Sequence, residues 1–338
     1  MRVIALEEHL VLPEVAAANR DLPPDLRSGF DLLSVRRDEL AADLADLEDR
    51  RIAFMDTYGI DVQVLSHSGP GAQRLAPDQA TELTRHINDT VAGAVARHPD
   101  RFAAFATLPT PAPDEAADEL ARCVGELGFC GAMVHGHTGG RYLDRPEFDP
   151  ILAAAAELGV PLYLHPGEPP APVRAAYYSD LGVGERSPLV EQLFATAGWG
   201  WHVDAAVHAL RLVLTGAFDR HPELQIILGH WGELIPYYLG RIDQVMSGVS
   251  SHLAKPVGTY LQEHVYITPA GLETVPPLLL ALSTFGADRI LYSVDYPYSA
   301  GRTAGWDFIE SAPLSELDKA KIAHLNAERL LPGLPRGE

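Results

Sequence analysis

Short apolar runs recur along this chain, and each is followed by a longer segment with the apolar spacing of a helix. Most of the runs lack the alternation of apolar and polar residues that a half-exposed strand shows. They therefore indicate strands buried on both faces, as in a parallel sheet covered by helices. The pattern predicts eight such strands, at residues 2–6, 61–66, 101–108, 131–136, 160–166, 224–230, 264–270 and 289–297.

The segments between the runs have helical periodicity and recognisable helix ends. Residues 38–60 place apolar side chains at helical spacing and stop at Gly59, a residue suited to a left-handed C-cap. Residues 77–99 and 113–128 each open with a proline, which is favoured in the first helical turn. Eight strands that alternate with helices along one continuous chain predict an α/β protein with a (β/α)8 TIM barrel.

An open, doubly wound α/β sheet is the main alternative fold. That fold normally has a glycine-rich phosphate turn after its first strand, whereas this chain has Glu-Glu-His at residues 7–9. No repeat or linker divides the sequence, so we expect one barrel domain over residues 1–338. Two insertions, at residues 10–38 and 166–188, follow predicted strands and are expected to cover the C-terminal face of the barrel, where active sites lie.

Composition argues against several classes of protein. The chain has 26 basic and 46 acidic residues, and its net charge of -20 opposes binding to nucleic acid or to an anionic membrane. No segment reads as a membrane span, and acidic residues come too early for a secretory signal, so we expect a cytoplasmic protein. Cys123 and Cys130 are too few for a disulfide framework and are expected to be small buried side chains.

Titratable side chains mark the ends of four predicted strands. Glu7 and His9 follow the first strand, His165 ends the fifth, His230 ends the sixth and Asp295 lies near the end of the eighth. In a barrel all these strand ends meet at one mouth, so residues far apart in sequence become neighbours. Imidazole and carboxylate groups together suit one divalent metal ion such as zinc or manganese, with magnesium as a third option.

The first strand offers two carboxylates, and we expect only one of them to face the mouth. Side chains alternate along a strand, so Glu7 shares a face with His9, while Glu8 points towards the helices or packs at the barrel wall. A single histidine at a strand end is more often structural than a metal ligand, but agreement among four strand ends favours a metal site. His135 and His137 form a competing pair, for which we prefer a substrate-facing role over metal binding.

Longer motifs extend this pattern over nearly the whole chain. They are ALEEH, VPLYLHP, AVHALRLVLTGAFDRHPELQIILGHWGE, RID at 241–243, GADRILYSVDYPY and NAERLL. With these motifs the chain resembles the amidohydrolase-2 family of the amidohydrolase superfamily, and within it the gamma-resorcylate and 2,3-dihydroxybenzoate decarboxylases. The resemblance is most specific over residues 205–233 and 286–298.

The resemblance implies a role for each candidate residue. In that family one divalent metal is bound by residues that correspond here to Glu7, His9, His165 and Asp295. His230 would then take a catalytic or orienting role beside the metal. The resemblance also implies that nearby groups hold this histidine, and Glu233 is the candidate for that support.

Other implied features concern the substrate and the assembly. Arg241 would reach the pocket of a neighbouring subunit or brace the site, although an interface salt bridge is an equally good interpretation. Homodimers or homotetramers are implied as well. The chain departs from the family at residues 135–142, where an Asn-containing segment is usual, and at residues 296–298, where Tyr-Pro-Tyr replaces Trp-Pro-Phe. The metal site is therefore better defined than the substrate.

The implied activity is a metal-dependent, non-oxidative decarboxylation of an ortho-hydroxybenzoate, by a carboxy-lyase. The substrate would bind the metal through its phenolic oxygen and one carboxylate oxygen, and Asp295 would protonate the ring carbon that bears the carboxylate. Tyr298 would hold the ring. The strongest rival is a hydrolase, in which Asp295 or His230 deprotonates a water that attacks an ester, lactone or amide. A metal-binding scaffold without catalysis is a third hypothesis.

Overall fold

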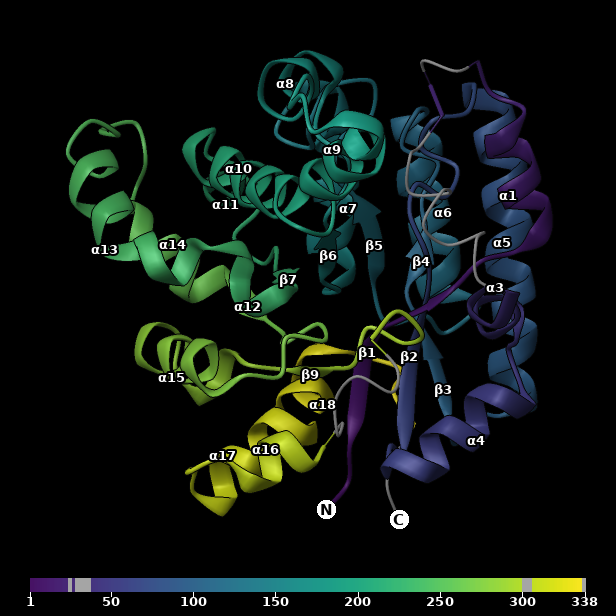
Figure 1. Ribbon diagram of the computed structural model, residues 1–338. Coiled ribbons are helices and arrows are strands. Elements are labelled where there is room, and N and C mark those ends of the chain that lie inside the picture. The colour runs from purple at the N-terminus through teal and green to yellow at the C-terminus, as the bar shows by residue number, and fades with distance from the viewer. Residues whose placement is uncertain (24–25, 28–37, 300–305, 336–338) are drawn as a thin grey trace.

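The structure, a computed structural model, describes residues 1–23, 26–27, 38–299 and 306–335 (Figure 1). The strands in this part of the chain pair in parallel and form two sheets, in the orders β3-β2-β1-β9 and β4-β5-β6-β7-β8. Their bounds are β1 Ile4–Leu10, β2 Val62–His67, β3 Phe102–Ala104, β4 Ala106–Thr107, β5 Ala132–His135, β6 Leu162–His165, β7 Ile226–Leu228, β8 Val265–Ile267 and β9 Tyr292–Ser293.

The two sheets meet along both edges. β3 and β4 are separated only by Phe105, whose amide donates to the Leu65 carbonyl (2.9 Å), so they occupy one strand position. At the other edge Ile267 of β8 forms a parallel bridge with Ile290, and the Leu291 amide donates to the Ile267 carbonyl (2.9 Å). Eight strand positions therefore follow one another in chain order, which confirms the predicted strands and the (β/α)8 fold class.

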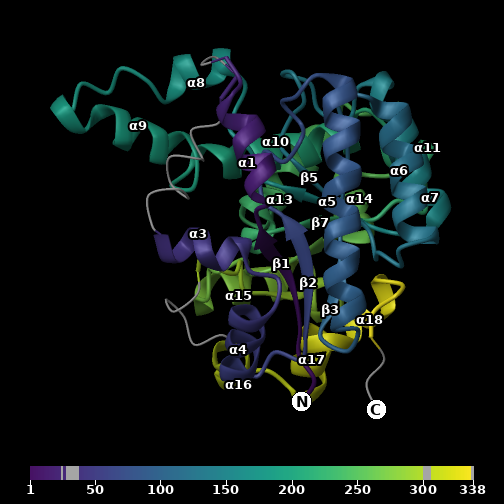
Figure 2. The same cartoon turned by 90° about the vertical axis from the view of Figure 1, so that its right-hand side faces the viewer.

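Helices surround the strands (Figures 1 and 2), and none among the described residues is long and apolar enough to cross a membrane. A π-helix covers Lys321–Leu325, and short 3₁₀ helices cover Pro146–Phe148, Gly184–Arg186 and Ala287–Arg289. The α-helices are α1 Pro13–Arg20, α3 Asp38–Ala45, α4 Asp49–Tyr58, α5 Pro77–Arg97, α6 Pro113–Gly125, α7 Asp149–Leu158, α8 Ala171–Tyr177, α9 Ser187–Ala195, α10 Gly200–Leu214, α11 Ala217–Arg220, α12 His230–Glu233, α13 Ile235–Met246, α14 Val257–His264, α15 Val275–Thr284, α16 Asp307–Ser311, α17 Glu316–Ala320 and α18 Asn326–Leu330.

One predicted helix, at residues 38–60, is two helices in the structure. The break between α3 and α4 lies at Asp46, whose carboxylate accepts hydrogen bonds from the amides of Arg50 and Arg51 (3.1 and 3.2 Å). These amides lie in the first turn of α4, where backbone donors have no helical partner, so the side chain starts a new helix. α4 ends at Gly59 with φ of 67°, the left-handed C-cap that the sequence predicts.

The two predicted insertions differ in how much the structure describes. Residues 166–188 contain α8 and the first residues of α9, and these two helices project beyond the barrel (Figure 2). Residues 10–38 contribute α1, whereas residues 24–25 and 28–37 lie outside the described part of the chain. The single-domain organisation stays a prediction.

The apolar core has an inner and an outer layer. Side chains such as Ile4, Leu6 and Met133 belong to the inner cluster, which residues of the C-terminal helix α18 also join. The outer layer packs the other strand faces against the helices and includes Ala5. Both cysteines are free and buried, Cys130 in the inner cluster and Cys123 in the outer one, as expected. Burial on both strand faces explains why the runs in the sequence lack alternation.

A buried polar network links β1 to α4 behind the strand ends. Gln63 donates to Glu8 Oε2 (2.9 Å), and the Val294 amide donates to Glu8 Oε1 (2.9 Å). Arg51, which is 0% exposed, donates to Gln63 Oε1 (3.3 Å) and to the His9 carbonyl (2.6 Å). Glu8 therefore packs at the barrel wall, as expected, and the network fixes the backbone at His9 and just before Asp295.

Replacing Arg51 by Met is expected to lower the free energy of unfolding by about 3 kcal/mol, because Gln63 and the His9 carbonyl lose a buried charged donor. Urea denaturation followed by circular dichroism measures this change. Arg50→Met is the matched control, since the Arg50 side chain is exposed and pairs with Asp43, so its urea midpoint should stay near that of the wild type. Equal midpoints for the two variants would contradict the structural role of Arg51.

Candidate active site

An open cavity of about 1190 Å³, which includes solvent at its mouth, lies where the strands end. It receives side chains from the segments that follow β6, β7, β8 and β9, as a barrel mouth does. The lining residues are Leu40, His165, Leu193, Ala197, Trp201, His202, His230, Ala270, Gly271, Leu272, Asp295, Tyr298 and Ser299.

Glu7 and His9 are buried beside this cavity, against Asp295 and His165 of its lining, because of an irregularity in β1. The inner cluster contains Leu6 and the outer one Ala5, so strict alternation would turn Glu8 inwards and Glu7 outwards. The pairing of β1 with β2 shifts between Ala5 and Glu8, and Glu7 has φ of 62°. This bulge adds one residue to β1, so each side chain after it points to the opposite face from the one that strict alternation predicts. Glu7 and His9 therefore share the cavity side, for a reason that simple alternation does not supply.

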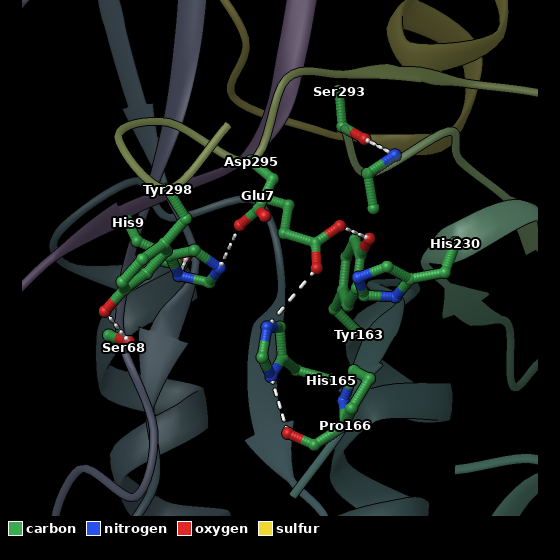
Figure 3. Close-up of polar contacts among 12 residues, drawn as sticks. Glu7, His9, Ser68, Tyr163, His165, Pro166, His230, Ser293, Asp295 and Tyr298 are labelled. Carbon is green, nitrogen blue, oxygen red and sulfur yellow. Dashed lines mark hydrogen bonds and ion pairs between the residues drawn. The ribbon is translucent and has the colours of Figure 1, made fainter. Parts of the chain in front are cut away.

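Four predicted side chains converge here (Figure 3). His165 Nε2 lies 3.3 Å from Glu7 Oε1, and His9 Nε2 lies 3.4 Å from Asp295 Oδ1. The His165 Nδ1–H group donates to the Pro166 carbonyl (2.7 Å), which leaves the Nε2 lone pair directed at Glu7. The ligand atoms of Glu7, His9 and His165 all lie within 4.8 Å of one another.

This donor set fits a divalent cation. Glu7 Oε1 and His9 Nε2 are buried, and neither has a hydrogen-bond partner among the described residues. Burial also raises the pKa of Glu7 to about 8 and lowers that of His165 well below its usual 6.5. The raised pKa shows that the ionised carboxylate is unfavourable among these buried lone pairs, and a cation bound there would offset this cost. Two imidazoles with carboxylates suit manganese or zinc.

A second cluster stands beside the first. Glu233 accepts hydrogen bonds from His230 Nδ1 (2.6 Å) through one oxygen and from His202 Nδ1 (2.7 Å) through the other. Burial alone would lower the pKa of His230, but the charge and hydrogen bond of Glu233 outweigh it and raise this pKa to about 9. The pair of imidazoles in turn lowers the pKa of the buried Glu233. This cluster therefore presents a positively charged His230 to the cavity.

Sequence reasoning missed His202. It lies on α10, far from any strand end, and the periodicity of that helix gives no sign that this side chain meets His230. The ring centroids of His202 and His230 lie 4.5 Å apart, and Trp201 Nε1 donates to His202 Nε2 (3.0 Å). The only signal in the sequence is the pairing of Trp201 with His202 at the start of a helix.

The structure places the remaining predicted residues less uniformly. Tyr298 lines the cavity, its hydroxyl lies 2.9 Å from Ser68 Oγ, and its ring meets His9 edge-on. His135 and His137 instead line a neighbouring cavity, and His135 Nε2 donates to the His67 carbonyl (2.9 Å). They stand beside the metal-type cluster, and the substrate-facing role expected for His135 stays a prediction.

Arg241 also differs from the expectation for a pocket residue. It is exposed on α13 and does not line the cavity of its own chain. A role inside its own active site is therefore not supported by its position. The other interpretations, contact with a neighbouring subunit's pocket or an interface salt bridge, stay predictions.

Backbone strain collects at this site. Glu7, His230 and Asp295 have φ of 62°, 48° and 62°, in the left-handed region that residues with a side chain rarely adopt. Each such residue costs of the order of 1–3 kcal/mol and persists only where the surroundings hold it. α12 is accordingly a strained turn rather than a regular helix, because Trp231 and Gly232 within it are also left-handed. At each of these three strand ends, an unfavourable backbone conformation directs one side chain towards the site.

A parallel barrel whose mouth holds two histidines and two carboxylates is the arrangement of a metal-dependent barrel enzyme. Comparison with known proteins agrees, because the Amidohydrolase family profile matches residues 12–333. The chain belongs to this family. The profile begins after Glu7 and His9, so these two residues rest on the geometry described above.

Individual relatives are similar over almost their full length. A gamma-resorcylate decarboxylase of Rhizobium radiobacter is 38% identical, with 97% of each chain covered. A solved 5-carboxyvanillate decarboxylase of Sphingomonas paucimobilis has a TM-score of 0.87 at 32% identity, covering 97% of this chain and 98% of that one. A dihydroxybenzoic acid decarboxylase of Polaromonas sp. JS666, solved with manganese and the inhibitor 2-nitroresorcinol, has a TM-score of 0.83 at 35% identity, covering 97% and 96%.

Removing the charge of Glu233 is expected to abolish the alkaline titration of His230. In metal-free protein, NMR titration should find a pKa of about 9 for the His230 ring. In Glu233→Gln, burial dominates and this pKa should fall below 6.5. Since the folded pKa exceeds the unfolded value, the stability from this pair is full below pH 6.5 and disappears as pH rises towards 9. An alkaline transition that survives in the variant would contradict this assignment.

Proposed function

We propose that this chain is a metal-dependent, non-oxidative decarboxylase that converts an ortho-hydroxybenzoate to the corresponding phenol and CO2. The observation that carries the proposal is the cluster of Glu7, His9 and His165, whose His9 also contacts Asp295. Two of its buried ligand atoms have no hydrogen-bond partner among the described residues. The decarboxylases to which the chain is similar act on dihydroxybenzoates and related ring acids, and one was solved with manganese.

Glu7, His9, His165 and Asp295 would hold the metal. When bound, a divalent cation supplies Lewis-acid stabilisation of negative charge on the substrate's oxygen atoms. His165 is ready for this role because its Nδ1 proton is already donated to Pro166. The proposed ion is manganese or zinc, and neither organic cofactor nor oxygen is needed for the overall reaction.

The chain's own residues supply the binding and proton-transfer steps. Trp201 and Tyr298 offer aromatic walls for a flat ring, and the protonated His230 offers a positive charge for an anionic substrate. Asp295 would transfer a proton to the ring carbon that bears the carboxylate. The bond from that carbon to the carboxylate then breaks, its electron pair returns to the ring, and CO2 leaves. Aromaticity lost on protonation is restored by this departure.

A homodimer is the assembly that we propose. The projecting helices α8 and α9 and the segments beside them expose apolar side chains to a degree that is unusual for a monomer's surface. A second copy of the chain could cover them and bring its Arg241 to this cavity. The exposed side chains are Tyr177, Leu181, Val183, Leu189, Val190, Leu193, Phe194 and Trp199. A cytoplasmic location stays a prediction from the sequence.

The decisive experiment is an ultraviolet assay of manganese-loaded protein against a panel of ortho-hydroxybenzoates. We expect conversion to the matching phenol, with at least a hundredfold loss in Asp295→Asn, which keeps the shape of the side chain but holds no transferable acid proton. Chelation should abolish the activity as well. Hydrolysis of esters, lactones or amides by the same preparation, with no turnover of the panel, would replace the decarboxylase by the rival hydrolase.

A histidine pair tests the metal site without any substrate. His165→Ala should abolish the rise in melting temperature that manganese gives to the wild type, because it removes a proposed ligand. His135→Ala is the matched control, since its ring lies 4.8 Å from that of His165 but its Nε2 is bound to a carbonyl. Loss of the metal response in both variants would show that the assignment of ligands is wrong.

Mixing two inactive variants tests the shared site. If Arg241 acts across the dimer, unfolding and refolding Asp295→Asn together with Arg241→Ala should restore about a quarter of the activity. Half of the dimers are then mixed, and each mixed dimer has one intact site out of two. Sedimentation should show a dimer for each protein. Absence of recovery in mixed dimers of confirmed composition would contradict a role for Arg241 in the partner's site.

A further inference from the structure

The two oxygens of Glu7 have different surroundings. Oε1 faces His165 Nε2 at 3.3 Å and has no hydrogen-bond partner among the described residues. Oε2 accepts a hydrogen bond from the hydroxyl of Tyr163, a residue of β6 that belongs to the inner cluster (Figure 3). Both side chains are 0% exposed. One oxygen is therefore occupied by a protein donor, and the other is left for a metal.

The Tyr163 hydroxyl belongs to a chain of hydrogen bonds with a fixed direction. The Ala270 amide donates to Ser293 Oγ (2.8 Å), and Ser293 donates to Thr268 Oγ1 (2.8 Å). Thr268 Oγ1 lies 3.0 Å from the Tyr163 hydroxyl. Tyr163 has a single hydroxyl proton and donates it to Glu7, so Thr268 donates to Tyr163 and Ser293 donates to Thr268. Three different strands or strand ends thus cooperate to place one proton against Oε2.

Close packing keeps the pair in this arrangement. A side-chain carbon built on Gly229, the residue after β7, would lie 3.0 Å from Glu7 Oε2 and 3.1 Å from the Tyr163 hydroxyl. These contacts are tighter than ordinary side-chain packing, so a larger residue at position 229 would push against the pair.

We propose that Tyr163 is a positioning residue that makes Glu7 a metal ligand through Oε1 alone. The inference rests on the proposed metal site and assigns a role to a residue that touches neither metal nor substrate. By holding Oε2, the phenol stops the carboxylate from rotating to offer both oxygens, which would take up a coordination position that a substrate needs. Mutation of a residue that orients a metal ligand typically lowers metal affinity or enzyme activity by about tenfold to a hundredfold.

The test compares Tyr163→Phe with Tyr142→Phe. Tyr142 is a suitable control because it is also buried and its hydroxyl donates to a buried carboxylate, that of Asp204, yet it does not line the cavity. Manganese affinity is measured from the electron paramagnetic resonance signal of free Mn²⁺, and the coordination is followed in the visible spectrum of Co²⁺-loaded protein. Melting temperatures of the metal-free proteins report the change in stability separately.

We expect Tyr163→Phe to weaken manganese binding by about tenfold to a hundredfold and to change the Co²⁺ spectrum. Tyr142→Phe should leave both as in the wild type, whatever its effect on melting temperature. Thr268→Val keeps Tyr163 but removes the donor behind it, and a smaller shift of the same sign is expected. If Tyr163→Phe does not fold, Thr268→Val decides the question by the same two measurements.

The outcomes separate this inference from the proposed function. Stoichiometric metal binding by the wild type, with unchanged affinity and spectrum in the Tyr163 and Thr268 variants, would overturn the positioning role and leave the decarboxylase proposal standing. Wild-type protein that binds no divalent metal would overturn both, starting with the metal site. Equal losses in Tyr163→Phe and Tyr142→Phe would show a general effect of buried tyrosines and would also overturn the inference.

Discussion

The mutual repulsion of buried lone pairs at the barrel mouth is the constraint on which the rest of the site depends. Glu7 Oε1 and His9 Nε2 have no hydrogen-bond partner in the part of the chain that the structure describes, and His165 Nε2 faces Glu7 Oε1. A fold tolerates such groups only if something positive joins them or if the surroundings prevent their separation. Here both conditions are met, because the donors suit a divalent cation and the supporting contacts lock each side chain in place.

The supporting contacts come from outside the cavity and explain why the strained backbone persists. Arg51 binds the carbonyl of His9, and Glu8 accepts the amide of Val294, the residue before Asp295. The bulge at Glu7 is thus held between two neighbouring strands. Strain of this kind is costly for stability, but it brings ligands from separate strands to one point, which a regular barrel rim cannot do.

Two groups of side chains, the metal-type cluster and the His230–Glu233 pair, stand side by side at the barrel mouth. Asp295 stands close enough to His9 for both to share a cation, while His230 takes its charge from Glu233 rather than from the metal cluster. A positive imidazole beside a metal site favours an anionic substrate, and aromatic walls favour a flat one. The same features occur in a chain that is 38% identical to a decarboxylase of hydroxybenzoates, so site and family lead to one reaction class.

The sequence by itself determined the eight strands, the barrel and the strand ends that carry Glu7, His165, His230 and Asp295, because burial on both faces leaves a local apolar signal. Only the tertiary structure decided the phase of β1, where a bulge reverses the alternation, and the partnership of His202 with Glu233. The bulge depends on how β1 pairs with its neighbouring strands. The contact between His202 and Glu233 joins α10 to the turn after β7. Neither leaves a periodicity along the chain, since both arise from contacts between residues far apart in sequence.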